Sequence, residues 1–355
     1  MATLGKIAGE IGKKYVVAGF DGFIDAIVHA VDVRDGDSYT RIDTIFNFGS
    51  RIVAAAGKST NIELVPQKKL VGGNGPIMAG AMHNFGANVQ YIGALGIPVS
   101  DIFADFAAKT HAVSIGNYGE THAVEFSDGK IIFGEMLPLC RVGVANLLDK
   151  MPEEDLVNAI DQCDAFALVN WTMMPHLDDI ARFFWKEILP KCSQRKRLFF
   201  FDLADPRKRK QSDLAEFLQV IRSFEQFGRS ILGLNVSEAQ QVLQTVAGTF
   251  NLSEREEEMR RAAEFLRESL GISLVFIHGI EMSAAAVAGK SSLASGYFVE
   301  NPQISTGAGD HYNAGFLAAY LCENDINFAI NFAAATAAFY VKTGRSPSLT
   351  DIKIL

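Results

Sequence analysis

The chain is poor in cysteine and shows none of the residue spacings that hold a structural metal. Its 355 residues include four cysteines, Cys140, Cys163, Cys192 and Cys322, which are scattered rather than paired. Its seven histidines do not form a His-Glu-x-x-His pattern, the helical spacing of many zinc sites. This composition argues against a disulfide framework or a zinc site, and it is typical of reduced thiols in a cytoplasmic protein.

Long apolar runs and an excess of basic charge are missing as well. No apolar run reaches the roughly 20 residues of a membrane-spanning helix, and residues 1–14 lack the apolar core of a signal peptide. The chain has 33 lysines and arginines against 41 aspartates and glutamates, a formal net charge of -8. Because nucleic-acid-binding proteins present a basic face, we expect neither a membrane nor a nucleic acid as a partner.

Apolar residues make up 48% of the chain and are arranged in alternating strand-like and helix-like segments. Short runs rich in β-formers predict strands at 16–20, 89–92, 166–170, 198–202, 231–235 and 274–278. Helix-like segments lie at 76–84, 100–109, 177–188, 214–226, 237–246, 253–270 and 330–342. This order indicates an α/β fold, with a mostly parallel sheet covered by helices on both faces.

Two segments, 27–45 and 114–133, break this order because their alternation suits antiparallel strands. His122–Phe126 and Lys130–Phe133 flank Ser127-Asp128-Gly129, a typical hairpin signal. We therefore assign 27–45 and 114–133 to a small β element, and 1–26, 46–113 and 134–355 to the main α/β domain.

The stretch from Ser305 to Phe316 brings small residues, one carboxylate and a helix start together. Gly307 and Gly309 allow the backbone to approach a ligand closely, and the apolar run that follows supplies a helix. The first amides of a helix have no internal partner and attract anions such as a phosphoryl group. Asp310 lies in the first turn, where its carboxylate would receive a proton.

Gly307-Ala308-Gly309-Asp310 resembles the C-terminal signature of the ribokinase-type (pfkB-type) carbohydrate kinases. The resemblance implies a ribokinase-like three-layer α/β/α fold, in which the small β element is a lid over the sugar. It also implies ATP-dependent phosphorylation of a hydroxyl group of a sugar or sugar-like metabolite. Asp310 would be the catalytic base, and the amides of Gly307, Ala308 and Gly309 would form an anion hole for the γ-phosphate.

The double glycine Gly72-Gly73 before Asn74 resembles the sugar-binding loop of the same family. Two glycines let bare backbone approach sugar hydroxyls. The first strand leads into Asp21 and Asp25, and ligands lie beyond the carboxyl ends of parallel strands. The family carries an aspartate here. Asp25 is the closer match, and Asp21 stays an alternative, either as a sugar ligand or as a helix cap.

Asn235-x-x-Glu238, at a predicted strand-helix junction, resembles the motif that this family uses for magnesium and phosphate. Mg²⁺ keeps most of its waters, so one or two protein oxygen atoms suffice. The resemblance implies further ATP contacts near Asn331 and Gly344, which would lie beside the adenine. It implies others from Asn235, His278, Gly279 and Thr306.

Three positions depart from the family pattern. Ile304 stands where a carboxylate could hold a monovalent cation, and His278 replaces a usual hydroxyl residue. His311 follows the presumed base where a small residue is more usual. An imidazole at that position would narrow the pocket or hydrogen-bond the substrate.

Two alternative functions stay open. Phe126, Phe133 and Tyr118, near the lid, would stack on the base of a nucleoside substrate. The unusual His278 and Ile304 are compatible with a non-catalytic sugar or nucleotide sensor. Apolar lid faces commonly pair between subunits in kinases of this type, so a homodimer through the lid is a further expectation.

Overall fold

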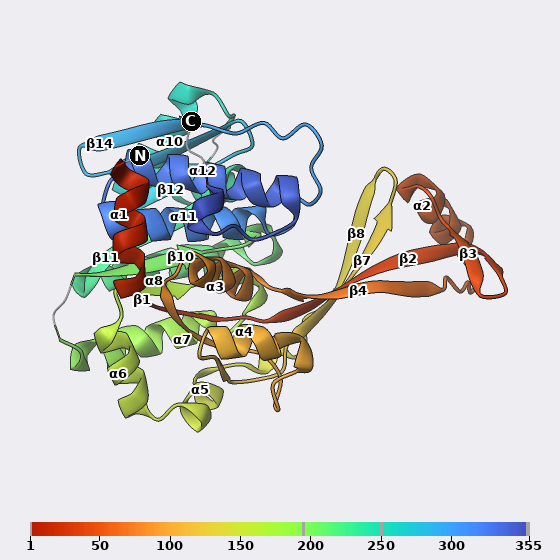
Figure 1. The fold of residues 1–355 in the computed structure, drawn as a ribbon, viewed down its shortest axis with the longest axis horizontal. Coiled ribbons are helices and arrows are strands. Elements are labelled where there is room, and N and C mark those ends of the chain that lie inside the picture. Colours follow the sequence, from red (N-terminus) through yellow and green to blue (C-terminus); the bar gives the residue numbers. More distant parts are fainter. Residues whose placement is uncertain (1, 194–195, 249–250, 353–355) are drawn as a thin grey trace.

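The computed structural model describes residues 2–193, 196–248 and 251–352, and its centre is a long, mostly parallel sheet (Figure 1). Over these residues the strand order is β14-β13-β12-β11-β10-β9-β1-β5-β6. Strands β12 to β6 run parallel, and β13 and β14 return antiparallel at one edge. In that order the strands span Lys290–Ser295, Met282–Val287, Leu274–His278, Gly228–Asn235, Arg197–Asp202, Ala165–Leu168, Tyr15–Phe20, Asn88–Gly93 and Val113–Ser114.

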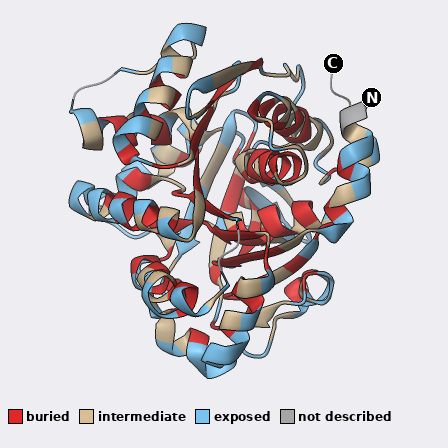
Figure 2. Ribbon diagram, turned by 90° about the vertical axis from the view of Figure 1, so that its left-hand side faces the viewer, coloured by how far each residue is buried: buried red, intermediate tan, exposed pale blue. Residues whose placement is uncertain are grey.

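Helices cover both faces of this sheet, and the buried residues lie mainly on the strands and on the helix faces turned toward them (Figure 2). One face packs against α5 (Val144–Lys150), α6 (Glu153–Gln162), α7 (Leu177–Phe183), α8 (Gln211–Ser223), α9 (Val236–Ala247) and α10 (Glu256–Leu270). The other packs against α1 (Ala2–Glu10), α3 (Asn74–Asn84), α4 (Ala104–Lys109), α11 (Ala308–Glu323) and α12 (Ile326–Thr343). The expected three-layer α/β/α architecture is confirmed.

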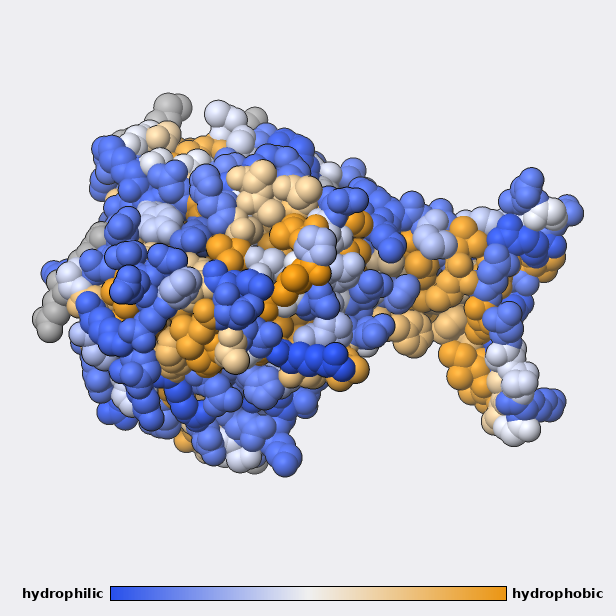
Figure 3. All heavy atoms as spheres, turned by 90° about the horizontal axis from the view of Figure 1, so that it is seen from below, coloured by the Kyte–Doolittle hydropathy of each residue, from blue (hydrophilic) through white to orange (hydrophobic). Residues whose placement is uncertain are grey.

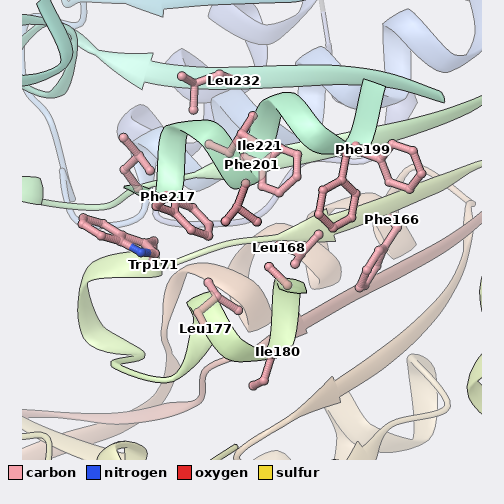
Figure 4. Packing of buried hydrophobic residues seen from close by; sticks show 14 of the residues in the cluster. Phe166, Leu168, Trp171, Leu177, Ile180, Phe199, Phe201, Phe217, Ile221 and Leu232 are labelled. Carbon is pink, nitrogen blue, oxygen red and sulfur yellow. The ribbon is translucent and has the colours of Figure 1, made fainter. Parts of the chain in front are cut away.

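The central strands supply a separate core to each helical layer. Along β10, Phe199 and Phe201 belong to one hydrophobic cluster, whereas Leu198 and Phe200 belong to the other. Successive strand residues point to opposite faces, so a strand covered on both sides reads as an unbroken apolar run. Figure 4 shows Phe199 and Phe201 packed with Phe166 of β9 and with residues of α7 and α8.

A second sheet projects from this body (Figure 1). Its strand order is β3-β2-β7-β8, and β4 also pairs with β2. These strands are β2 (Phe23–Asp35), β3 (Ser38–Arg41), β4 (Leu64–Gly72), β7 (Gly119–Phe126) and β8 (Gly129–Glu135), and α2 (Ile45–Ala54) packs at the far end. We call these five strands and α2 the lid.

The lid contains more of the chain than the two segments assigned to it from sequence. Strand β4 and helix α2 fall within 46–113 for most of their length, which the sequence analysis gave to the main domain. Strand β4 escaped notice because most of its residues are partly or fully exposed and it includes Pro66, which is tolerated in an edge strand. It pairs antiparallel with β2 from Phe23 opposite Gly72 to Ala30 opposite Leu64.

Among the described residues, no helix combines the length and apolar character needed to cross a membrane.

Close packing of α11 on α12 depends on Gly315. A Cβ atom at this position would lie 2.7 Å from Thr336 Oγ1 and 2.9 Å from Ala333 Cα. We therefore expect Gly315→Ala to force the two helices apart and to lower the free energy of unfolding by about 1–3 kcal/mol, as measured by chemical denaturation.

The matched control is Gly5→Ala in α1, an exposed position where a Cβ would meet nothing within 4 Å. This change should leave stability unaltered or raise it by roughly 0.5–1 kcal/mol through helix propensity. Equal stability of Gly315→Ala and the unmodified protein would contradict the close approach of the helices.

Candidate active site

Polar side chains gather where the parallel strands of the main sheet end. Asp21 follows β1, Asn170 follows β9, Asp202 ends β10, Asn235 ends β11 and His278 ends β12. The carboxyl ends of parallel strands meet at one edge of a sheet, where α/β proteins bind ligands. The strand ends therefore place on one edge residues that are as much as 257 positions apart in the sequence, from 21 to 278.

A cavity of about 690 Å³ is lined both by this edge and by the lid. Its size suits a small metabolite. The residues predicted from sequence that line it are Asp25, Gly73, Asn74, Thr306 and Asp310. Residues of β2, β4, β7 and β8 contribute part of the wall, so the end of the lid nearest the main domain borders the cavity.

Helix α11 begins at this cavity. Gly307 is its N-cap, with a φ of 87° in the left-handed region that glycine adopts readily. The amide of Ala308 donates to Ser305 O over 3.2 Å and is thus used within the turn. The amides of Gly309 and Asp310 make no hydrogen bond within the described residues. Two free amides at the positive end of a long helix form an arrangement that binds anions.

Asp310 is a buried carboxyl group, 8% exposed, in the first turn of α11. Burial raises its pKa well above the usual range, and the nearby carboxylates of Asp202 and Asp21 raise it further. A hydrogen bond from Asn74 acts in the opposite direction. Asp202 accepts a hydrogen bond of 3.0 Å from Asn313 Nδ2. The raised pKa makes Asp310 a stronger base than an exposed aspartate.

The structure separates the two aspartates that sequence reasoning left as alternatives. Asp21 is fully buried and accepts hydrogen bonds from Gly75 N at 2.9 Å and from Asn170 Nδ2 at 2.6 Å. Burial raises its pKa to about 6. Asp25 instead lines the cavity and accepts a hydrogen bond of 2.6 Å from Thr121 Oγ1. Asp21 thus caps the start of α3, and Asp25 is the aspartate that a ligand would meet.

The double glycine lets the chain pass between these two carboxyl groups. A Cβ at Gly72 would overlap the carboxylate of Asp25, and a Cβ at Gly73 would lie 2.7 Å from Asp21 Oδ2. Gly73 also has a φ of 95° as the N-cap of α3. The next residue, Asn74, lines the cavity, and its Nδ2 lies 3.5 Å from Asp202 Oδ1.

Asn235 and Glu238 form a reciprocal capping box at the start of α9. Asn235 Oδ1 accepts from Glu238 N at 2.9 Å, and Glu238 accepts from Asn235 N at 2.9 Å and from Asn235 Nδ2 at 2.6 Å. Burial and the charge of Asp202 raise the pKa of Glu238 well above its usual range. A buried carboxyl group that other acids repel fits a cation, and Mg²⁺ needs few protein ligands. Among described residues, no cluster of three or more acidic, histidine or cysteine side chains could itself hold a metal.

The residues expected to meet ATP do not all lie together. His278 stacks on Tyr312 with 4.6 Å between ring centroids, and burial lowers its pKa to about 4. Its Cε1 would lie 3.5 Å from a Cβ at Gly309, beside the free amides. The amide of Gly279 donates to Met282 O over 2.7 Å in the turn before β13.

Asn331 and Gly344 are too far apart to flank one adenine. Both belong to α12 or its C-cap, 13 positions apart, which is about 20 Å at roughly 1.5 Å per residue. Asn331 Nδ2 donates to Asn327 O on its own helix at 2.8 Å. Gly344 lies at the end of α12, close to Gln303 in the segment before α11. Only Gly344 is therefore near the loop that leads into the free amides.

A family model described as prokaryotic ketohexokinase matches residues 2–355. The chain belongs to the prokaryotic ketohexokinase family. A ketohexokinase from Haloferax volcanii is 26% identical over 341 residues, covering 95% of this chain and 89% of that protein. Among solved structures, a carbohydrate kinase from Agrobacterium tumefaciens has a TM-score of 0.63 at 17% identity and covers 96% of this chain and 94% of that one. A ribokinase from Thermotoga maritima has a TM-score of 0.58 at 18% identity, covering 96% and 95%.

Membership of the ketohexokinase family confirms the resemblance read from the sequence and makes the protein an ATP-dependent carbohydrate kinase. The three aromatic side chains that would stack on a nucleoside base do not line the cavity. Phe126 packs on Phe48 inside the lid, and Tyr118 packs on Phe103. Phe133 does not line the cavity, and its side chain is about half exposed.

Sequence reasoning missed several polar residues of the site. Lys130, on β8 of the lid, donates to Thr306 Oγ1 over 2.9 Å and lines the cavity. No local pattern marks it, because the contact joins residues 176 positions apart. Asn170 and Asp202 were detectable, since each follows or ends an apolar strand as Asn235 does. Thr121 was missed because its contact with Asp25 depends on the pairing of β7 with β2, which the sequence does not reveal.

The charge of Asp202 gives a testable effect on pH dependence. Asp202→Asn removes a charge that raises the pKa of Asp310. The facing amide of Asn313 can reverse to match the new side chain, because its Oδ1 has no partner among the described residues. Since a base acts only when ionised, the acid limb of kcat/KM against pH should move to lower pH.

Asp149→Asn is the control, because Asp149 is an exposed residue that pairs with Lys150 and is not named among the groups that shift the pKa of Asp310. Its acid limb should stay in place. An unchanged limb in Asp202→Asn, or a move to higher pH, would show that the two carboxyl groups do not interact as described.

Proposed function

We propose that this kinase transfers the γ-phosphoryl group of ATP to a hydroxyl of a ketohexose, with Asp310 as the base. The observation that carries the proposal is the position of Asp310, in the wall of the cavity and beside two free helix amides. The family name and the name of the Haloferax relative support a ketohexose as acceptor. Asp310 takes the proton of the attacking hydroxyl, and the groups around it fix the geometry.

The sugar is held at the lid side of the cavity. Asp25 accepts hydrogen bonds from sugar hydroxyls, and Asn74 and the backbone at Gly73 lie beside it. Asp21 acts indirectly, because it fixes the start of α3 through Gly75 N. Thr121 holds the carboxylate of Asp25 in place. This division leaves one aspartate for the ligand and one for the fold.

The phosphate side lies at the start of α11. Bound there with Mg²⁺, the nucleotide supplies the phosphoryl group. Of the predicted anion hole of Gly307, Ala308 and Gly309, the free amide of Gly309 would face this negative charge, together with the free amide of Asp310. Lys130 brings a positive charge from the lid to Thr306. Asn235 and Glu238 on this side would hold Mg²⁺ through its waters. The other residues expected to contact the nucleotide here are His278, Gly279 and Gly344.

A cytosolic location is also proposed. No disulfide joins the four cysteines in the described part of the chain, which fits a reducing compartment.

The activity is tested by ATP consumption with Mg²⁺ across a panel of ketohexoses, aldoses, sugar-derived keto acids and nucleosides. A ketohexose should give the highest kcat/KM. Asp310→Asn should lower kcat by roughly 10²–10⁴, the usual contribution of a general base, while nucleotide binding measured by calorimetry stays near normal.

Asp101→Asn, an exposed aspartate at a short helical turn, serves as the matched control and should keep full activity. Near-normal turnover by Asp310→Asn would remove it from the role of base. A nucleoside preferred over every sugar would overturn the ketohexose assignment.

We also infer that the lid joins two copies of the chain. Its outer residues include large apolar side chains that are half or more exposed, namely Val33, Phe46, Ile52 and Val53. Phe46 is 78% exposed and Val53 is 75% exposed, both on α2. Figure 3 shows apolar residues gathered along the projecting lid. An exposed apolar patch of this kind is typical of a protein-protein interface.

Sedimentation velocity over a range of concentrations tests this inference. The unmodified protein should sediment as a dimer, and the double change Phe46→Glu with Val53→Glu should give a monomer. Ile280→Glu, a residue that is 83% exposed outside the lid, should leave the dimer intact. A monomeric unmodified protein at all concentrations would refute the inference.

A further inference from the structure

His311 is a buried polar residue in the wall of the cavity, directly after Asp310. It is 2% exposed and lines the cavity together with Asp25, Lys130 and Asp310. Its Nδ1 lies 2.7 Å from Gly307 O. Because a carbonyl oxygen can only accept a hydrogen bond, Nδ1 must carry the proton. This contact fixes the tautomer of the ring.

The opposite nitrogen is left as an acceptor without a partner. Burial lowers the pKa of His311 to about 4, so the imidazole is neutral at neutral pH. A neutral ring protonated at Nδ1 has a lone pair at Nε2. That Nε2 is buried and has no hydrogen-bond partner within the described residues. Buried polar atoms normally have a partner, so an unpaired one beside a cavity points to a ligand.

The ring cannot turn freely to satisfy Nε2 elsewhere. It stacks on Tyr340 with 3.7 Å between centroids and 14° between planes. The Tyr340 hydroxyl in turn donates to Thr306 O over 3.1 Å. His311 and Tyr340 thus hold the carbonyl groups of two consecutive residues, Gly307 and Thr306. The hydrogen bond at Nδ1 and the stack together direct Nε2 away from the α11 backbone.

The position of His311 indicates which ligand would meet Nε2. The cavity wall contains Asp25, Asn74 and Asp310, the side chains assigned to the sugar. Of the residues expected to contact ATP, the described part of the wall includes Thr306, but none of Asn235, His278 or Gly279. His311 directly follows Asp310 and shares this wall with Asp25 and Asn74, so Nε2 borders the part of the cavity assigned to the sugar.

We propose that Nε2 of His311 accepts a hydrogen bond from a second hydroxyl of the sugar, one that is not phosphorylated. The residue then selects among sugars by the presence and configuration of that hydroxyl. The inference rests on the proposed function, since it takes a sugar as the ligand of this cavity. A site built to pair with a hydroxyl rejects analogues that lack it, because its own polar group is left unpaired.

Two variants separate the two nitrogens. His311→Asn places an amide near the Nδ1 position and retains a donor for Gly307 O, but it has nothing at the Nε2 position. His311→Gln places an amide oxygen near the Nε2 position and loses the donor to Gly307. The test measures kcat/KM for the sugar that the unmodified protein phosphorylates best and for each of its monodeoxy analogues.

In the unmodified protein, we compare kcat/KM for the parent sugar with kcat/KM for each monodeoxy analogue that keeps the phosphorylated hydroxyl. For one of these analogues, the ratio of the two values should be about 10 to 100. His311→Asn should lose activity on the parent and bring this ratio close to one, with nucleotide affinity unchanged. His311→Gln should retain most of the ratio. Tyr340→Phe keeps the stack and loses only the hydroxyl, so it should lower turnover on all sugars alike and leave the ratio intact.

The inference would be overturned if, for every analogue, the ratio of kcat/KM values were the same in His311→Asn as in the unmodified protein. A ratio lost equally in Tyr340→Phe would also overturn it, because the effect would then come from positioning of the loop. The unmodified protein's own panel tests the proposed function separately. If its best substrate is not a ketohexose, the ketohexose assignment fails while the ratio is still measured on the sugar it does use, and activity on no sugar would overturn both.

Discussion

The site depends on the compensation of four carboxyl groups that are buried together at one edge of a parallel sheet. Burial raises the pKa of Asp21, Asp202, Glu238 and Asp310 alike. Such groups persist in a fold only when hydrogen-bond donors or opposite charges compensate them. The protein supplies donors mainly from backbone and amide groups. A shortage of positive charge remains at this edge, where α11 begins with two free amides.

The main sheet was predictable because its central strands are covered on both faces. Each of them reads as a short apolar run, as in Leu198 to Phe201, and the runs recur between helical segments. Strands β13 and β14 escaped prediction for a physical reason. Met282–Val287 contains three consecutive alanines, which favour helix over strand, and Lys290–Ser295 is short and mostly polar. Their pairing at the sheet edge depends on tertiary contacts.

The site was predictable where its residues are neighbours in sequence and obscure where the fold brings them together. The glycine turn before Asp310 and the capping box at Asn235 are local, so their geometry follows from spacing. Asp21 and Asp25 differ in burial and in hydrogen-bond partners, which no spacing reveals. Asn331 was placed near adenine by resemblance, yet the rise of α12 separates it from Gly344. Lys130 reaches Thr306 only because β8 folds back over the cavity.

Strand β2 is long enough to act as a mechanical lever. It begins beside the cavity at Phe23, carries Asp25 near its base and continues to Asp35, where β3 pairs with it. From Asp25 to Asp35 the strand covers about 33 Å at roughly 3.3 Å per residue. When the strand pivots at its base, a sideways displacement of the far end therefore produces a much smaller displacement of Asp25. The outer end of the lid can therefore change its contacts while Asp25 keeps its place.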